Sequence, residues 1–243
     1  MNEKISCSCN DEHTSGCMIC GEELMYTDEY MDNTLIHAQC AYCKKEEDTR
    51  VICCKGHYVC DECHRKEILD FVEQICGQSD LTDPVELAEQ IFQLPGLHMH
   101  GPEYHSIVPA ILMTAYDNKI MRDKKTDIAE AIKRGKDIKG GVCGSHGACG
   151  AAIGIGIAYS IIHRVTPFSQ EERGTANRMT ALALLEISRF GGPRCCKRDA
   201  MLAIETALKH MGCFTAMDDR RYICRQFMNN KGCIGVVCPY FPS

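Results

Sequence analysis

The chain has 243 residues, 45% of them hydrophobic, and a formal net charge of −6. It is long enough to bury a sizeable core in one large or two smaller domains, and we expect two. The negative charge disfavours a protein whose main task is to bind phosphate backbones, so nucleic acid is a secondary expectation. No apolar run reaches the roughly 20 residues of a membrane span, which predicts a protein without a membrane partner.

The 19 cysteines are several times the number in an average chain of this size. Disulfides, metal ligands and catalytic thiols are the alternatives. Disulfides belong to oxidising compartments, and the first residues lack the apolar run of a secretory signal. Many cysteines form Cys-x-x-Cys pairs beside histidine, which is the spacing of zinc and iron–sulfur sites. We therefore expect a cytoplasmic metal-binding protein.

The N-terminal region carries several of these pairs. Cys7 and Cys9 form a Cys-x-Cys pair that is either a mobile thiol pair or an accessory ligand. Beyond them, two Cys-x2-Cys knuckles lie nineteen residues apart, and a further run adds four ligands at knuckle spacing. The candidate ligands are Cys17, Cys20, Cys40, Cys43, Cys54, His57, Cys60 and Cys63.

Eight ligands predict two structural zinc ions, because structural zinc takes four nitrogen or sulfur ligands. A segment with few large apolar side chains needs such crosslinks to fold. The pairing stays open between two arrangements. In a cross-brace, one ion is held by Cys17, Cys20, Cys54 and His57, and the other by the remaining four cysteines in the order of a treble clef: knuckle, hairpin, helix. In a sequential arrangement, one ion is held by Cys17, Cys20, Cys40 and Cys43.

The run from Cys54 to Cys63 resembles part of a RING finger, but the final ligand pair of that motif is absent after Cys63. The region is therefore expected to be a structural or partner-binding module and not a ubiquitin ligase. Apolar residues at helical spacing, among them Ile68 and Ile75, predict a helix that begins near Asp61. We place a domain boundary at its end, between a cysteine-rich zinc-binding domain (residues 1–78) and a helical domain (residues 79–243).

The second domain opens with clear helix signals. Asp83 and Pro84 are a capping residue and a first-turn proline, and Leu94-Pro95-Gly96 predicts the end of that helix. Pro109 is expected to kink the next helix or to confine it to its first turns. Further helices are predicted over residues 122–139, 167–190 and 199–211. The fold class is mostly α, a helical bundle with a small zinc-stabilised N-terminal domain.

Three histidines, His98, His100 and His105, lie at a glycine- and proline-bounded helix entrance. Because imidazole binds metals and exchanges protons near neutral pH, they predict a ligand or metal site. A glycine-rich turn and apolar helix at residues 140–160 carry Cys143, His146 and Cys149. This stretch lacks the lysine and the strand of a phosphate-binding loop.

A thiolate at the N-terminus of a helix is stabilised by the helix dipole. The motif of Cys143, His146 and Cys149 therefore suits a metal ligand, a redox thiol or a nucleophile equally. The chain then ends in spaced cysteines, the last of which precedes a proline, as in some iron–sulfur sites. The candidate cofactor ligands there are Cys213, Cys224, Cys233 and Cys238. A zinc site and a C-terminal clip packed on the core are the alternatives.

The residues Cys149-Gly-Ala-Ala-Ile-Gly154 resemble the signature of the C-GCAxxG-C-C redox-active protein family, and Phe190 to Cys195 resembles its Phe-Gly turn before the next cysteine. The resemblance covers residues 100–213 and implies a redox-active protein with metal or iron–sulfur binding. The family has a cysteine early in the upstream helix, where this chain has His105, which implies a mixed Cys/His site. The whole chain also resembles proteins encoded or fused near radical-SAM and methyltransferase enzymes, which implies such an enzyme as partner.

The leading hypothesis is a metal-binding redox protein that passes electrons or sulfur to a partner enzyme. Its site would be built from three turns, at residues 98–105, 143–149 and 195–196. The core thiolates would be Cys143, Cys149, Cys195 and Cys196, with His98, His100, His105 and His146 as ligands or proton donors. Two alternatives are an enzyme that acts on a small molecule or a modified RNA base, with Cys149 as nucleophile or sulfur carrier, and a zinc-dependent adaptor.

Overall fold

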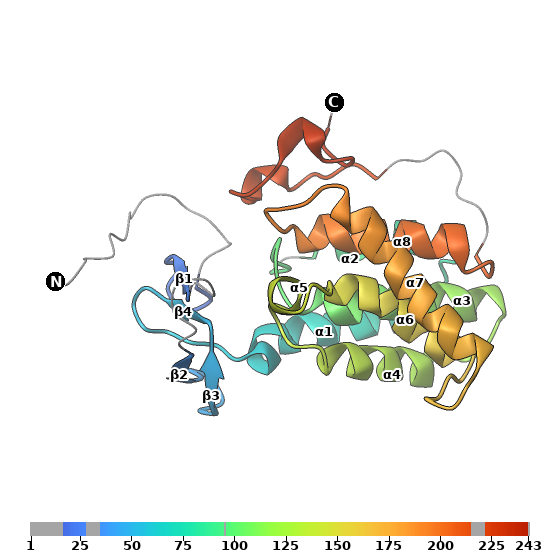
Figure 1. The fold of residues 1–243 in the computed structure, drawn as a ribbon, viewed down its shortest axis with the longest axis horizontal. Helices are drawn as coiled ribbons and strands as arrows, with labels where there is room; N and C mark the ends of the chain where they lie inside the picture. Colours follow the sequence, from blue (N-terminus) through green and yellow to red (C-terminus); the bar gives the residue numbers. More distant parts are fainter. Residues whose placement is uncertain (1–16, 28–34, 95, 215–221, 243) are drawn as a thin grey trace. The chain divides into compact units, whose positions relative to one another are not determined.

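The computed structural model describes residues 17–27, 35–94, 96–214 and 222–242 (Figure 1). Cys7 and Cys9 lie outside the described residues. The protein is mostly helical, and the chain divides into two compact units between His64 and Arg65. This division falls in the first turn of α1 (Asp61–Gln78), the helix at whose end the sequence-based boundary was placed. None of the described helices combines the length and the apolar character that crossing a membrane would require.

The first unit contains two small antiparallel sheets. Strand β1 (Leu24–Tyr26) pairs with β4 (Val51–Cys53), and β2 (Ile36–Gln39) forms a hairpin with β3 (Glu46–Thr49). The buried residues described here are one alanine and four cysteines: Cys17, Ala38, Cys40, Cys53 and Cys60. Sheets this short with so little apolar burial do not hold together by packing alone. The cysteines are therefore the interior of this unit.

The second unit is a helical bundle with one continuous hydrophobic core. After α1 it contains α2 (Pro84–Ile91), α3 (Tyr104–Lys119), α4 (Lys125–Lys136), α5 (Val142–Ser145), α6 (Gly150–Ile162), α7 (Glu171–Ser188) and α8 (Cys196–His210). The 3-10 helices η1 (Phe227–Asn229) and η2 (Gly235–Val237) follow. Helix α3 is buried along most of its length and packs against α2, α4, α6 and α8.

The helix predictions differ in detail from the structure. Helix α4 spans Lys125–Lys136 where residues 122–139 were predicted, and α7 spans Glu171–Ser188 where residues 167–190 were predicted. Pro109 lies inside α3, but the helix continues to Lys119, so the proline does not confine it to the first turns. Helix α8 begins at Cys196, three residues before its predicted start at Asp199, with Cys195 as its N-cap in an extended conformation. Cysteine is a weak helix former, which is why apolar periodicity alone does not extend the helix this far.

Glycines let α6 pack closely against its neighbours in the bundle. A Cβ at Gly154 would lie 2.9 Å from Cδ of Pro109 on α3, and one at Gly156 would lie 2.4 Å from Oγ1 of Thr180 on α7. Gly150, at the start of α6, lies against the ring of His105. With no side chain at these positions, α6 approaches α3 on one side and α7 on the other. This packing fixes the starts of α3 and α6 beside each other.

Candidate metal centres

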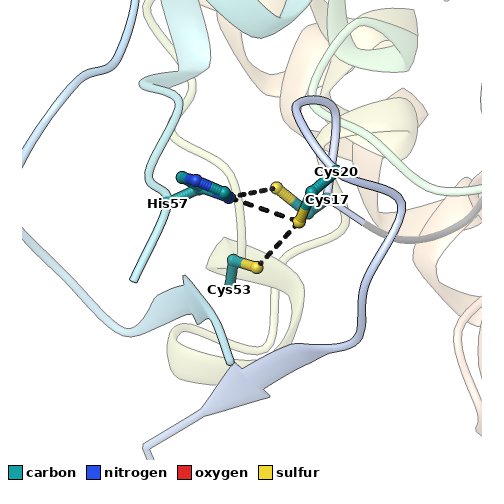
Figure 2. Close-up of side chains that lie close together, drawn as sticks. All are labelled: Cys17, Cys20, Cys53 and His57. Atoms are coloured by element: carbon teal, nitrogen blue, oxygen red, sulfur yellow. Dashed lines mark hydrogen bonds between the residues drawn. The ribbon is translucent and has the colours of Figure 1, made fainter. Parts of the chain in front are cut away.

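Cys17, Cys20, Cys53 and His57 form the first ligand group of the N-terminal unit (Figure 2). Their ligand atoms lie within 4.8 Å of one another. Nδ1 of His57 is 3.2 Å from Sγ of Cys20 and 3.8 Å from Sγ of Cys17, and the sulfurs of Cys20 and Cys53 are 3.5 Å apart. All four side chains therefore point at one centre, and the cysteines are free thiols and not disulfides.

Local backbone structure prepares both halves of this group. The backbone N–H of Ile19 donates to Sγ of Cys17 at 3.4 Å, and that of Lys55 donates to Sγ of Cys53 at 3.3 Å. The tight turn between Cys53 and His57 is closed by Gly56, whose φ of 82° lies in the region that favours glycine. Pairing of β1 with β4 then joins the two halves, which are far apart in the sequence.

The sequence-based set contained Cys54, and this choice was wrong: Cys53 is the member of the group and Cys54 is not. Cys53 is the last residue of β4 and is fully buried, whereas Cys54 is only partly buried. Successive side chains of a strand point to opposite faces, so only one of two adjacent cysteines can reach the centre. A strand prediction at 51–53 with Val51 and Cys53 on one face would have favoured Cys53.

Cys40, Cys43, Cys60 and Cys63 form the second group, again with all ligand atoms within 4.8 Å. The sulfurs of Cys43 and Cys60 are 3.6 Å apart, and the backbone N–H of Cys60 donates to Sγ of Cys40 at 3.4 Å. The first pair lies at the turn between β2 and β3, and the second pair lies at the start of α1. Burial acts to raise the pKa of Cys40, but backbone N–H groups, that of Cys60 first, outweigh it and lower the pKa to about 6.

The four ligand pairs alternate along the chain between the two groups. The first and third pairs form one group, and the second and fourth form the other. This is the cross-brace order, and the sequential arrangement does not occur. Three thiols with an imidazole, and four thiols, are donor sets that bind metal ions tetrahedrally. Both groups can thus hold a metal ion, and each ion would tie together segments that the short strands alone hold weakly.

The helical unit holds a third set of thiols at helix starts. Cys149 is the N-cap of α6, and Cys196 is the first residue of α8. Cys149 lies near enough to Cys196 to raise the pKa of the Cys196 thiol, and Cys143 acts in the same way on Cys149. Burial and the nearby Asp199 raise the pKa of Cys149 to about 11, although the backbone N–H of Ala152 opposes them.

The predicted histidines are placed differently from one another. His105, in the first turn of α3, is buried against Gly150, and its Nδ1 donates to the carbonyl of Ile138 at 3.1 Å, which leaves the lone pair on Nε2. His100 donates from Nε2 to Oδ1 of Asn230 at 3.1 Å and so contacts the C-terminal tail. The carbonyl of His98 accepts from the hydroxyl of Tyr104, and His146 is exposed beside Ser145.

The adjacent cysteines 195 and 196 face different surroundings. The thiol of Cys196 accepts a hydrogen bond from the backbone N–H of Gly101 and lies near Cys149, whereas Cys195 lines a cavity under the C-terminal tail. The other cysteines in that cavity are Cys224, Cys233 and Cys238. Cys213, the remaining member of the predicted tail set, does not line it; its backbone carbonyl accepts from Lys119.

The family DUF5714, described as a family of unknown function, matches residues 72–241. The chain belongs to this family. The DUF5714 segment begins inside α1 and covers the helical bundle, the helix-start thiols and the tail cavity, while both N-terminal metal groups precede it. No curated protein and no solved structure matches the chain. The resemblance to the C-GCAxxG-C-C family therefore rests on its residues and stays a hypothesis.

Proposed function

We propose that this protein is a metal-binding redox protein. Its N-terminal unit would hold two structural zinc ions, and its helical unit would pass electrons or sulfur to a partner enzyme. The observation that carries the redox part is that Cys149 and Cys196 stand at two helix starts, with Cys149 near enough to raise the pKa of Cys196, and that His105 lies beside Gly150 in the first turn of a third helix. Reactive thiols of redox proteins are typically held at helix starts.

Zinc is the metal that fits the N-terminal groups best. Ligands on a tetrahedron with Zn–S bonds of about 2.3 Å lie roughly 3.8 Å apart, and the sulfur pairs of the two groups lie 3.5 and 3.6 Å apart. All four positions of each group are filled by side chains. Closed sites of this kind are structural, because no position remains for a substrate or water.

The helix-start thiols support redox chemistry in either of two forms. As a dithiol, Cys149 and Cys196 would form a disulfide and release two protons and two electrons, which the partner enzyme takes up. As a metal centre, Cys143, Cys149 and Cys196 would be thiolate ligands, and Nε2 of His105 would be the imidazole ligand that the family resemblance implies. The separate resemblance of the whole chain to proteins encoded or fused near radical-SAM and methyltransferase enzymes implies a partner of that type.

The experiment is a redox titration of the anaerobically purified full chain. Samples poised at different potentials are alkylated, and the modification of each cysteine is measured by mass spectrometry. We expect Cys149 and Cys196 to change together at one midpoint, with Cys76, buried in the hydrophobic core, as the unreactive internal control. Metal occupancy of the same samples separates the dithiol from the metal centre. Independent, ordinary titration of every helical-unit cysteine in a metal-free unit would refute the proposal.

A second candidate function is an enzyme with Cys149 as nucleophile or sulfur carrier, acting on a small molecule or a modified RNA base. It is favoured by the backbone N–H groups of Ala151 and Ala152, which donate to the thiol of Cys149 and would stabilise its thiolate. A Cys149→Ser variant distinguishes the two candidates. If the variant keeps its metal and its remaining redox behaviour but loses turnover of a substrate, the enzyme function holds.

A further inference from the structure

Four cysteines from distant parts of the chain line one cavity in the helical unit. Cys195 comes from the start of α8, and Cys224, Cys233 and Cys238 come from the C-terminal tail. The other side chains of its wall are mainly apolar or aromatic, among them Met99, Tyr222 and Tyr240. Four thiols that converge in an apolar pocket are the donor set of an iron–sulfur cluster or a zinc ion.

The tail itself has little regular structure that would hold these thiols in place. Its two helices are three-residue 3-10 turns. It is folded back by a hydrogen bond from the N–H of Cys224 to the carbonyl of Tyr240 at 2.8 Å, and by edge-to-face contacts of Tyr222 with Tyr240 and Phe92. An irregular segment in which three cysteines point into one cavity is the kind of structure that a bound metal group stabilises.

A buried cation points independently to an anionic occupant. Lys197, next to Cys195, is 1% exposed and lines the same cavity. Its ammonium donates to the carbonyl of Phe92 at 2.8 Å and to the side-chain oxygen of Gln226, both of which are neutral, and the buried carboxylate of Glu103 acts on it electrostatically. Burying a charge is costly unless an opposite charge compensates for it. A cluster with four thiolates would add negative charge directly beside this ammonium, on which Cys195 and Cys224 already act, whereas the second cation of the wall, Arg198, is paired with Asp199.

The spacing of the thiols separates a cluster from a single zinc ion. In the N-terminal groups all four ligand atoms lie within 4.8 Å, as one ion requires, and within the described residues the four thiols of the cavity do not form such a group. A [4Fe–4S] cluster holds its four thiolates farther apart, because each thiolate binds a different iron atom at a corner of the cluster. The wider arrangement therefore favours a cluster.

We propose that Cys195, Cys224, Cys233 and Cys238 bind a [4Fe–4S] cluster between the start of α8 and the C-terminal tail. The proposal rests on the proposed function, which supplies the partner that receives the electron. It adds the group of this protein that carries the electron. The cluster takes up one electron from a low-potential donor, passing from the 2+ to the 1+ state with no bond broken. The ammonium of Lys197 stabilises the additional negative charge of the reduced state.

The test uses the full chain, purified anaerobically and reconstituted with ferrous iron and sulfide. We expect about four iron and four acid-labile sulfide per chain, a broad visible absorption that bleaches with dithionite, and an electron paramagnetic resonance signal of the reduced cluster. Cys233→Ser is expected to reduce the iron content at least fourfold, and Cys213→Ser, the matched control outside the cavity, to leave it unchanged. Both variants should retain the helical circular dichroism and the zinc of the parent.

A second variant tests the site without removing a ligand. Lys197→Met is expected to keep the iron content and to lower the reduction potential, whereas Lys209→Met, an exposed lysine on the same helix, changes neither. If Lys197→Met and Lys209→Met both have the reduction potential of the parent, Lys197 does not compensate the negative charge of a cluster, and its assigned electrostatic role is wrong. A third zinc ion per chain that is lost in Cys233→Ser, or no iron in the reconstituted parent, overturns the cluster.

The proposed function and the cluster fail separately. A Cys149→Ser variant lies outside the cavity and should keep the cluster. If the cluster forms and is reduced while Cys149 and Cys196 titrate as ordinary thiols, the cluster stands and the helix-start redox site is wrong. If those two thiols change together while iron is absent, the redox function stands and the cluster is wrong.

Discussion

Two adjacent cysteines at the end of β4, one inside the first metal group and one outside it, offer a sharp test of the structure. Cys53→Ser removes a thiol that faces the centre, and Cys54→Ser removes its neighbour that does not. Structural zinc contributes on the order of 10–16 kcal/mol of binding free energy per site. If four ligands share this about equally, one ligand carries roughly 3–4 kcal/mol, so Cys53→Ser should weaken zinc binding on the order of 10²–10³-fold.

The described residues of the N-terminal unit form no hydrophobic core that would offset this loss. Its described buried residues are four cysteines and Ala38, and the methyl group of Ala38 contributes less than about 1 kcal/mol by burial. The unit is therefore expected to lose its fold together with its zinc in Cys53→Ser. Cys54→Ser should differ from the parent by less than about 0.5 kcal/mol, as is usual for partly exposed positions without a special role.

The assay is zinc competition with a chromophoric chelator, combined with the zinc stoichiometry after dialysis. The parent and Cys54→Ser should retain two zinc ions per chain, and Cys53→Ser should retain one at most. Limited proteolysis reports the fold of the N-terminal unit in the same samples. Loss of zinc in Cys54→Ser with unchanged binding in Cys53→Ser would show that the alternation of side chains along β4 had been assigned to the wrong face.

Three further predictions concern the helical unit and its stability after metal is removed from the N-terminal unit. Gly150→Ala would place a Cβ 2.2 Å from the ring of His105, so it should lower the free energy of unfolding by about 1–3 kcal/mol. The control Gly174→Ala lies on an exposed face of α7 with no neighbour within 4 Å and should raise the free energy of unfolding by up to about 1 kcal/mol. Thermal unfolding measures both effects. Burial raises the pKa of Asp117 to about 6 despite its ion pair with Arg122. As the pH rises, the carboxyl group loses its proton first in the unfolded chain, so the contribution of Asp117 to stability should decrease as the pH is raised from about 4 to about 6. Denaturant titrations of Asp117→Asn should lack that part of the pH dependence. Removal of zinc by a chelator should expose the N-terminal unit to protease and leave the helical circular dichroism largely intact, because the hydrophobic core begins at Ile68; a cooperative loss of helix would contradict this.

Much of the helical fold could be predicted from the sequence because its signals are local. Asp83 caps α2 with a hydrogen bond of 2.8 Å to the N–H of Val85, as the Asp-Pro pair predicts. The apolar periodicity of α1 identifies Ile68 and Val72 as core residues, although Phe71 in the same pattern is 48% exposed. A helix turns about 100° per residue, so the pattern predicts a face but not how wide the covered part of that face is.

The glycine-rich helix α6 shows where local reasoning ends. Its composition predicts close packing, and the structure supplies the partners: Pro109 on α3 and Thr180 on α7. These contacts join residues dozens of positions apart in the chain. Nothing in the sequence of α6 alone states which helix lies on which side, because helix pairing depends on the whole bundle.

By itself the sequence determined that this is a mostly helical protein with an N-terminal module whose cysteines can hold metal ions, because helix caps, apolar periods and Cys-x2-Cys knuckles are formed by residues that are neighbours in the chain. Only the tertiary structure decided the role of each cysteine in the two adjacent pairs. Cys53 faces the first metal group and Cys54 does not; Cys196 lies by Cys149, while Cys195 lines the cavity under the tail. Adjacent side chains in extended backbone point in opposite directions. The segment that each side chain contacts depends on strand pairing for Cys53 and Cys54, and on the fold of the C-terminal tail for Cys195 and Cys196.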